Sequence, residues 1–165
     1  MKAMFQLCLA AGLLLGCGCA AGISRQGYTL QDIKNAELAN TNLVAACHLA
    51  IKNGATYEAS EVDILGKIEA FDTSVSVDCD EAYVLDIFCR EACALGADFV
   101  NLTDEHYPSF WSTCYRAKAE FLRYKNRDQA KLIVSDAKYD PQLIIERSKE
   151  QKKRQEAVII VSAGH

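Results

Sequence analysis

A regular alternation of apolar and charged positions predicts a strand over 114–124. Within this stretch the odd positions from 115 to 121 are apolar, and the even positions carry Arg116, Lys118 and Glu120. A period of two is typical of a strand that has one face against a core. Similar patterns predict further strands over 61–71, 75–79 and 99–103. Gly66, inside the first of these, marks a bulge or a close approach of another segment.

A helical period of apolar positions predicts a helix over 81–95. Apolar residues recur at spacings of three and four across this segment, which places them on one face of the helix. Asp80 is a suitable N-cap, and Gly96 is a suitable stop. Together with the four strands this gives the order β-β-α-β-β. The prediction is an α+β domain over 28–125 with one sheet and one covering helix.

Further helical segments are expected before the first strand and after the last one. Residues 29–53 approximate a helical stripe in one or two pieces. Residues 126–165 form a charged tail, which begins with a short helix over 126–139. Asp140-Pro141, an N-cap followed by proline, starts a second tail helix. The apolar end of the tail, 157–161, either continues this helix or docks as an edge strand.

The first residues resemble the leader of a bacterial lipoprotein. A basic start, Met1-Lys2, precedes an apolar run from Met4 to Leu15, which is too short to span a bilayer as a helix. The run ends in Leu14-Leu15-Gly16-Cys17. This ending is similar to a lipobox, in which the signal is cut before the cysteine and the cysteine thiol receives a diacylglycerol anchor.

The leader predicts where the protein is located. It implies a signal peptide over 1–16, lipidation of Cys17 with palmitate-type chains, and a tether over 17–27. Gly18 stands where many inner-membrane lipoproteins have aspartate, so the outer membrane, on its periplasmic face, is the expected destination. An ordinary secretory signal cut near Ala20 or Ala21 is the alternative.

Eight cysteines are many for 165 residues, and an oxidising envelope permits disulfides. Once Cys8 leaves with the signal and Cys17 carries lipid, six cysteines remain, which allow fifteen pairings. Cys79 and Cys114 are the best candidates for a bridge. Each lies at the end of a predicted strand, where a bridge does not distort the strand interior.

The other cysteines are open to several interpretations. Cys89 and Cys93 lie four apart on the predicted helix and are expected to be small buried apolar residues. Cys47 and His48 are adjacent, so their side chains diverge, and no C-x-x-C motif accompanies them. We therefore expect no zinc site and no cofactor. The pairing of Cys19, Cys47, Cys89 and Cys93 stays open.

Several short motifs resemble a family of small envelope lipoproteins. They are Ile64-Leu65-Gly66, a cysteine after the second strand, Ala94-Leu95-Gly96-Ala97-Asp98, and Pro108-Ser109-Phe110-Trp111-Ser112-Thr113-Cys114-Tyr115-Arg116. The segment from Tyr57 to Lys125 is similar to small envelope lipoproteins of unassigned function in Bacteroidetes. It is similar more distantly to RcsF-type outer-membrane stress-sensor lipoproteins. This resemblance implies a disulfide-held sensing or binding domain, with Cys79 and Cys114 as its bonded pair.

The net charge and the absence of several catalytic motifs limit the classes of function that the sequence supports. A net charge of −4 gives no global attraction to nucleic acid. The chain has no glycine-rich phosphate loop, no G-x-S-x-G elbow and no paired-histidine zinc motif. We expect a membrane-anchored, non-enzymatic module that binds envelope proteins or cell-wall components. The alternative is a thiol- or metal-dependent envelope enzyme that uses Cys114 and His106.

Two groups of residues are candidates for ligand or partner contact. Phe110 and Trp111, in the aromatic turn before the last strand, are expected to be buried anchors of that turn or to line a ligand groove. Lys152, Lys153 and Arg154 lie in the charged tail. They form either a solvated helix face or a basic surface for anionic lipid head groups or an envelope partner.

Overall fold

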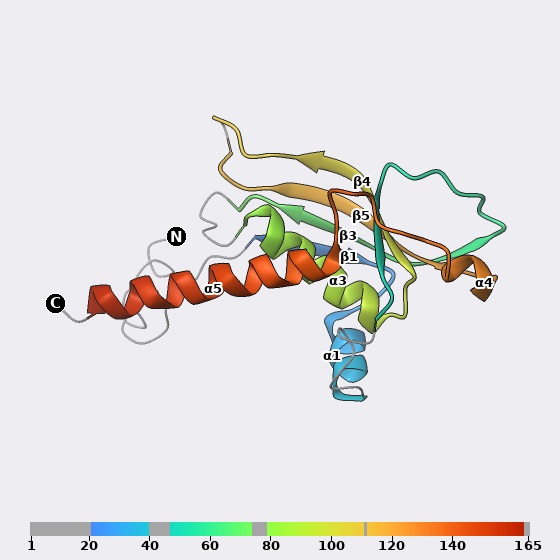
Figure 1. Ribbon diagram of the computed structural model, residues 1–165, viewed down its shortest axis with the longest axis horizontal. Coiled ribbons are helices and arrows are strands. Elements are labelled where there is room, and N and C mark those ends of the chain that lie inside the picture. The colour runs from blue at the N-terminus through green and yellow to red at the C-terminus, as the bar shows by residue number, and fades with distance from the viewer. Residues whose placement is uncertain (1–20, 40–46, 74–78, 111, 164–165) are drawn as a thin grey trace, which may run out of the picture.

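The computed structural model describes residues 21–39, 47–73, 79–110 and 112–163 and shows a five-stranded sheet with helices on one face (Figure 1). The elements in chain order are β1 (Gly22–Gln26), α1 (Leu30–Ala39), β2 (Ala50–Asn53), β3 (Val62–Phe71), α3 (Glu81–Ala94), β4 (Phe99–His106), β5 (Arg116–Tyr124), α4 (Arg127–Ala130) and α5 (Pro141–Ala163). The strand order across the sheet is β1-β3-β5-β4-β2. This arrangement confirms the predicted α+β class.

The alternation of β5 determines which of its residues reach the core. Ala117, Ala119 and Phe121 are buried on the helix-covered face, whereas Lys118 is exposed on the other. β5 lies between β3 and β4 and is antiparallel to both. Its central place in the sheet explains why its pattern is the most regular one in the sequence.

The predicted helix α3 covers this apolar face. Val84, Leu85 and Phe88 are almost completely buried, and the Phe88 ring meets Phe121 edge-on with ring centroids 6.5 Å apart. The side chain of Asp80 accepts a hydrogen bond from the backbone N–H of Tyr83, which is the expected N-cap. Burial of these apolar side chains stabilises the contact by roughly 1.5–3 kcal/mol for each large residue.

The tail helix α5 begins at the predicted Asp140-Pro141 and lies on the outer side of α3. Asp140 accepts hydrogen bonds from the backbone N–H groups of Gln142 and Leu143. Ile144 and Ile145 are buried in the first turns. The helix then continues well past the strands and α3, so that its second half projects from the domain (Figure 1). The open choice for 157–161 is thereby decided in favour of the helix.

The prediction of helix over 50–53 is wrong, because this segment is the edge strand β2. It pairs parallel to β4, with Ile51 opposite Val100, and Ile51 is fully buried. Its outer edge is covered by a later segment: the backbone N–H of Asp136 donates to the carbonyl of Ile51 at 2.9 Å, and the Ile51 N–H donates to Ser135 Oγ at 3.0 Å. These partners are distant in sequence, so a local period could not reveal them.

Two further boundaries differ from the prediction. Part of the expected tether forms β1, which pairs antiparallel with β3, with Gly22 opposite Phe71. The helix expected over 126–139 is only the short α4, because the chain then runs extended beside β2. Residues 75–78 of the predicted strand and the whole lipobox lie outside the described residues.

Gly66 marks both a bulge and a close approach, as predicted. The register between β3 and β5 shifts between Ile64 and Gly66. A Cβ atom on Gly66 would lie 2.3 Å from Cδ1 of Tyr28, whose ring packs over this point. Tyr28 is held there because its hydroxyl donates to Glu91 on α3 at 2.6 Å. Only glycine leaves room for this ring.

Two disulfides fix α3 at both ends. Cys79 is bonded to Cys114, which confirms the predicted pair, and both residues are buried. Cys93, in the last turn of α3, is bonded to Cys47 just ahead of β2. The expectation of an unpaired Cys93 is therefore wrong. Cys47 comes from the segment just ahead of β2, a strand distant in sequence from α3 that the sequence pattern did not reveal. Cys89 is a free and buried thiol, as expected.

Breaking the Cys79–Cys114 bond should lower the free energy of unfolding by roughly 2–4 kcal/mol. Cys79→Ser and Cys114→Ser break the same bond, so the double variant should lose little more than the worse single one. Urea unfolding under non-reducing conditions measures these losses. As a control, Cys79→Ser combined with Cys93→Ser breaks two separate bonds, and its losses should add. Additive losses for Cys79→Ser with Cys114→Ser would contradict the pairing.

Candidate functional site

The end of the sheet where β4 passes into β5 carries three tyrosines around one carboxylate. We call Tyr107, Tyr115, Tyr139 and Glu105 the tyrosine cluster. Oε1 of Glu105 accepts from the hydroxyl of Tyr115 at 2.5 Å and from that of Tyr107 at 3.1 Å. Oε2 accepts from the hydroxyl of Tyr139 at 2.6 Å and from the side-chain amide of Asn53. Each oxygen of the Glu105 carboxylate thus accepts from at least one tyrosine hydroxyl.

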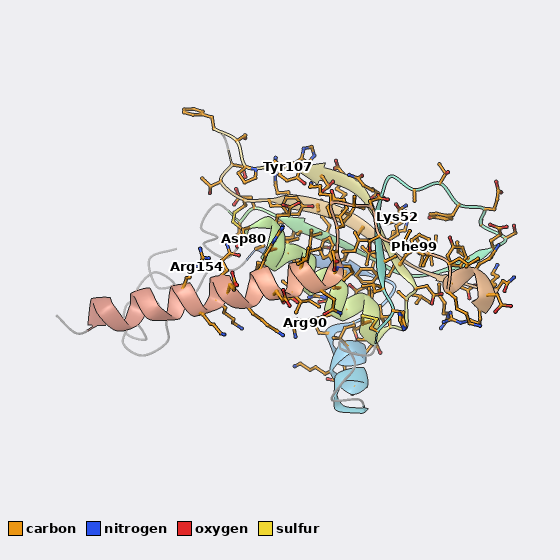
Figure 2. All side chains as sticks on the ribbon, in the orientation of Figure 1. Lys52, Asp80, Arg90, Phe99, Tyr107 and Arg154 are labelled. Atoms are coloured by element: carbon orange, nitrogen blue, oxygen red, sulfur yellow. A yellow bond between two sulfur atoms is a disulfide. The ribbon has the colours of Figure 1, made fainter. Side chains whose placement is uncertain are left out.

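Lys138 connects this cluster to the start of α3. Its Nζ lies 4.3 Å from the ring centroid of Tyr107 and 4.7 Å from that of Tyr139, in cation–π geometry. The same ammonium group lies 3.2 Å from Oε1 of Glu81. The segment that leads into α5 is thereby tied to β4 and to α3. Figure 2 shows Tyr107 at this end of the sheet.

The tyrosine cluster is arranged to hold position rather than to transfer protons. Burial, together with the hydrogen bond to Glu105, raises the pKa of Tyr115 far above its usual value. The same two causes raise the pKa of Tyr139. Both phenols therefore stay protonated at neutral pH and act as donors to a fixed acceptor.

The aromatic turn follows directly from the tyrosine cluster. Ser109 and Ser112 close it with two backbone hydrogen bonds of 2.7 and 3.3 Å, and the Ser112 hydroxyl donates to Asp72 at 2.7 Å. Phe110 lies at the tip of this turn, and the residue is 92% exposed. The expectation of a buried anchor is wrong for Phe110, because the turn extends beyond the sheet. Trp111 lies outside the described residues.

The sheet face opposite the helices holds a shallow depression of about 320 Å³, which we call the sheet basin. Its lining consists mainly of polar and charged side chains: Ser24, Gln26, Lys67, Glu69, Thr103, Lys118 and Glu120. Lys67 lies 2.6 Å from Glu120, and Lys118 lies 3.2 Å from Glu69. Two positive and two negative charges therefore pair across the strands. The sheet basin carries no net charge.

Tyr57 extends the sheet basin at one side. Its hydroxyl donates to Oε2 of Glu120 at 2.5 Å. Burial would raise the pKa of Glu120, but the hydrogen bonds from Lys67 and Tyr57 more than offset it and hold the pKa below its usual value. Burial and the bond to Glu120 raise the pKa of Tyr57 to about 12. At this side of the sheet basin the Glu120 carboxylate thus stays ionised and the Tyr57 hydroxyl stays protonated at neutral pH.

The structure does not bring the candidate enzyme pair together as a reactive couple. Cys114 is buried and bonded to Cys79, so its sulfur is not a thiol in the oxidised chain. His106 is exposed, with Nε2 3.2 Å from Asp104. Burial raises the pKa of the Cys89 thiol to about 12, which makes it a poor nucleophile at neutral pH.

The basic tail residues are exposed, as the contact hypothesis requires. Lys152, Lys153 and Arg154 all lie on the surface of α5, and Arg154 has a weak contact of 3.7 Å with Glu150. Figure 2 shows Arg154 on the part of α5 that extends beyond the strands. Exposed pairs of this kind contribute little stability, so the cluster stays available to a partner.

Sequence reasoning missed a buried ion pair between α3 and β1. Glu91 on α3 is only 6% exposed and accepts from Arg25 of β1 at 2.9 Å and from Tyr28 at 2.6 Å. The sequence did contain a signal for this pair. Glu91 is a charged residue three positions after Phe88, inside the apolar stripe of α3. Buried charges are paired, so that position implied a cation on another element.

Within the residues that the structure describes, no helix is long and apolar enough to cross a membrane. In the same part of the chain, histidine, cysteine, aspartate and glutamate side chains form no group of three or more that would hold a metal ion.

Stability should fall as the pH rises through about 9–11, because the folded chain keeps tyrosine protons that the unfolded chain releases. The raised pKa of buried Tyr115 makes it a principal source of this loss. Tyr115→Phe should therefore give a flatter profile of unfolding free energy against pH than the parent protein. Urea unfolding across this range provides the measurement. Parallel profiles for the two proteins would contradict the assignment.

The chain was also compared with known proteins. No protein-family model matches it, and neither a curated protein nor a solved structure does. The resemblance to envelope lipoproteins therefore stays a prediction from short motifs.

Proposed function

We propose that the protein is a lipid-anchored envelope lipoprotein whose folded domain is a non-enzymatic binding module. The observation that carries this proposal is the pairing of four cysteines in two disulfides. Disulfides persist in oxidising compartments such as the bacterial envelope. The lipobox-like sequence Leu14-Leu15-Gly16-Cys17 supplies a matching export and anchoring signal.

The sheet basin is the proposed binding surface of the module. Its two lysines and two glutamates cancel in charge, while hydroxyl and amide groups of Ser24, Gln26 and Thr103 surround them. Such a surface offers alternating donors and acceptors without attracting a strongly charged ligand. It suits an uncharged or zwitterionic polar ligand, such as a peptide segment of an envelope protein or a cell-wall component.

The alternative enzymatic function loses its main support. In both its thiol-dependent and its metal-dependent form it uses the Cys114 sulfur together with His106, and that sulfur is bonded to Cys79. The remaining free thiol in the described part of the chain, Cys89, is buried inside the core. Neither cysteine offers a substrate an accessible thiolate.

Changing the lipobox cysteine tests the anchor. Cys17→Ser should abolish incorporation of labelled palmitate and move the protein from the membrane fraction to the soluble periplasmic fraction, because the acyl chains supply most of the membrane affinity. Cys19→Ser is the matched control and should keep both label and location. Fractionation with acyl labelling measures both properties. Membrane retention of Cys17→Ser without label would contradict the lipoprotein assignment.

Site-specific photo-crosslinking tests the sheet basin. A photoreactive residue in place of Thr103 should give an adduct with a protein or a cell-wall fragment in intact cells, because Thr103 is exposed and lines the basin. Lys118→Glu should remove this adduct, since it unbalances the charges of the basin. The same photoreactive residue at Asp128, on α4, is the control. Equal adducts at Thr103 and Asp128 would show that the basin is not the binding surface.

A further inference from the structure

Several chain segments meet at one end of the sheet, which we call the turn end. Strand pairing places Gly22 opposite Phe71, and Arg116 opposite His106. The start of β1, the end of β3, the start of β5 and the end of β4 therefore all lie at this end. The aromatic turn with its exposed Phe110 projects from it.

The second half of α5 extends toward the same end (Figure 1). Between Lys149 and Arg154 it carries four exposed basic residues and one exposed acid, Glu150. The whole chain has a net charge of −4, so this is a local basic surface on an acidic protein. Beyond it the helix backbone continues through an apolar sequence, 157–161, to Ala163.

The chain enters the fold at the turn end as well. Cys17 is five residues before Gly22, and five residues span at most about 18 Å when fully extended. An acyl chain on Cys17 would thus hold the start of β1 close to the bilayer. The turn end, rather than the opposite end with α4, would then face the membrane.

We propose that the turn end is a contact surface for an anionic lipid bilayer, a proposal that rests on the anchor at Cys17. Phe110 enters the interfacial region, where aromatic side chains are favoured. The basic residues of α5 lie against acidic head groups, whose charge they complement. The acyl chains and this surface together fix the orientation of the domain and leave the sheet basin facing sideways for a partner.

Fluorescence of the chain's single tryptophan reports directly on this contact. Trp111 is adjacent to Phe110 in the sequence, and the protein contains no other tryptophan. The acylated full-length mature protein is placed in phosphatidylcholine vesicles with and without phosphatidylglycerol. Acylation is first verified by mass, so that failure of the anchor is recognised separately. Emission and quenching by lipids brominated near the head group are then recorded.

With phosphatidylglycerol present, Trp111 emission should shift to shorter wavelength and be quenched by the brominated lipids. Phe110→Ser should reduce the quenching severalfold, whereas Leu132→Ser, an exposed apolar residue after α4 at the opposite end, should not. The combined changes Lys152→Gln, Lys153→Gln and Arg154→Gln should weaken the apparent affinity of the turn end for vesicles with phosphatidylglycerol roughly tenfold or more. Most of the dependence on phosphatidylglycerol should thereby be lost. Lys34→Gln, Lys125→Gln and Lys131→Gln, which also removes three exposed positive charges, is the charge-matched control set.

Two results would overturn the proposal. Acylated protein that binds vesicles while Trp111 stays unquenched would show that the anchor holds and the turn end does not touch lipid. No quenching in pure lipid vesicles, together with a crosslink from a photoreactive residue at position 110 to a membrane protein in intact cells, would assign the turn end to a protein partner instead.

Discussion

Attachment of α3 to the sheet at both ends is the constraint on which the rest of the structure depends. Cys79 stands one residue before the N-cap Asp80, and its bond to Cys114 joins that end of α3 to the approach to β5. Cys93, in the last turn, is bonded to Cys47 ahead of β2. The two closed loops span 35 and 46 residues, for which the chain-entropy model gives roughly 3–4 kcal/mol each.

The clamped helix also determines which surfaces are free. α3 covers one face of the sheet and α5 packs against α3, while the buried pair of Glu91 and Arg25 ties β1 to α3. On the other face, a second apolar cluster forms at the α4 end, from Ala50, Val62, Phe99 and Leu122. The remainder of that face stays polar and forms the sheet basin. The proposed partner surface and the proposed membrane surface are therefore separate, and one domain can serve both at once.

The sequence predicted the parts of this fold that depend on local periods. Apolar and polar positions alternate regularly in β5, and α3 has an N-cap and a glycine stop. Gly66 inside a strand pattern predicted the bulge over which Tyr28 packs. Parts that depend on distant partners were missed. Ala50 and Ile51 read as helix, although parallel pairing with β4 and a covering segment near Asp136 make them a strand.

The same limit applies to the candidate site. The sequence predicts Cys93 as an unpaired core residue. Its partner Cys47 is distant along the chain and comes close only because β2 pairs with the sheet. The tyrosine cluster joins residues from β4, from the approach to β5 and from the approach to α5, which no spacing in the sequence connects. In contrast, the exposed position of the basic residues on α5 follows from their composition alone, and the structure agrees with it.

Intact-mass spectrometry of the protein purified from its own membranes, without reducing agent, tests the central claim most directly. The claim is that one chain is both acylated at Cys17 and closed by two disulfides. The expected mass is that of residues 17–165 with acyl groups added and four hydrogens removed, two for each disulfide. A mass without acyl groups, or one that retains these four hydrogens, would contradict it.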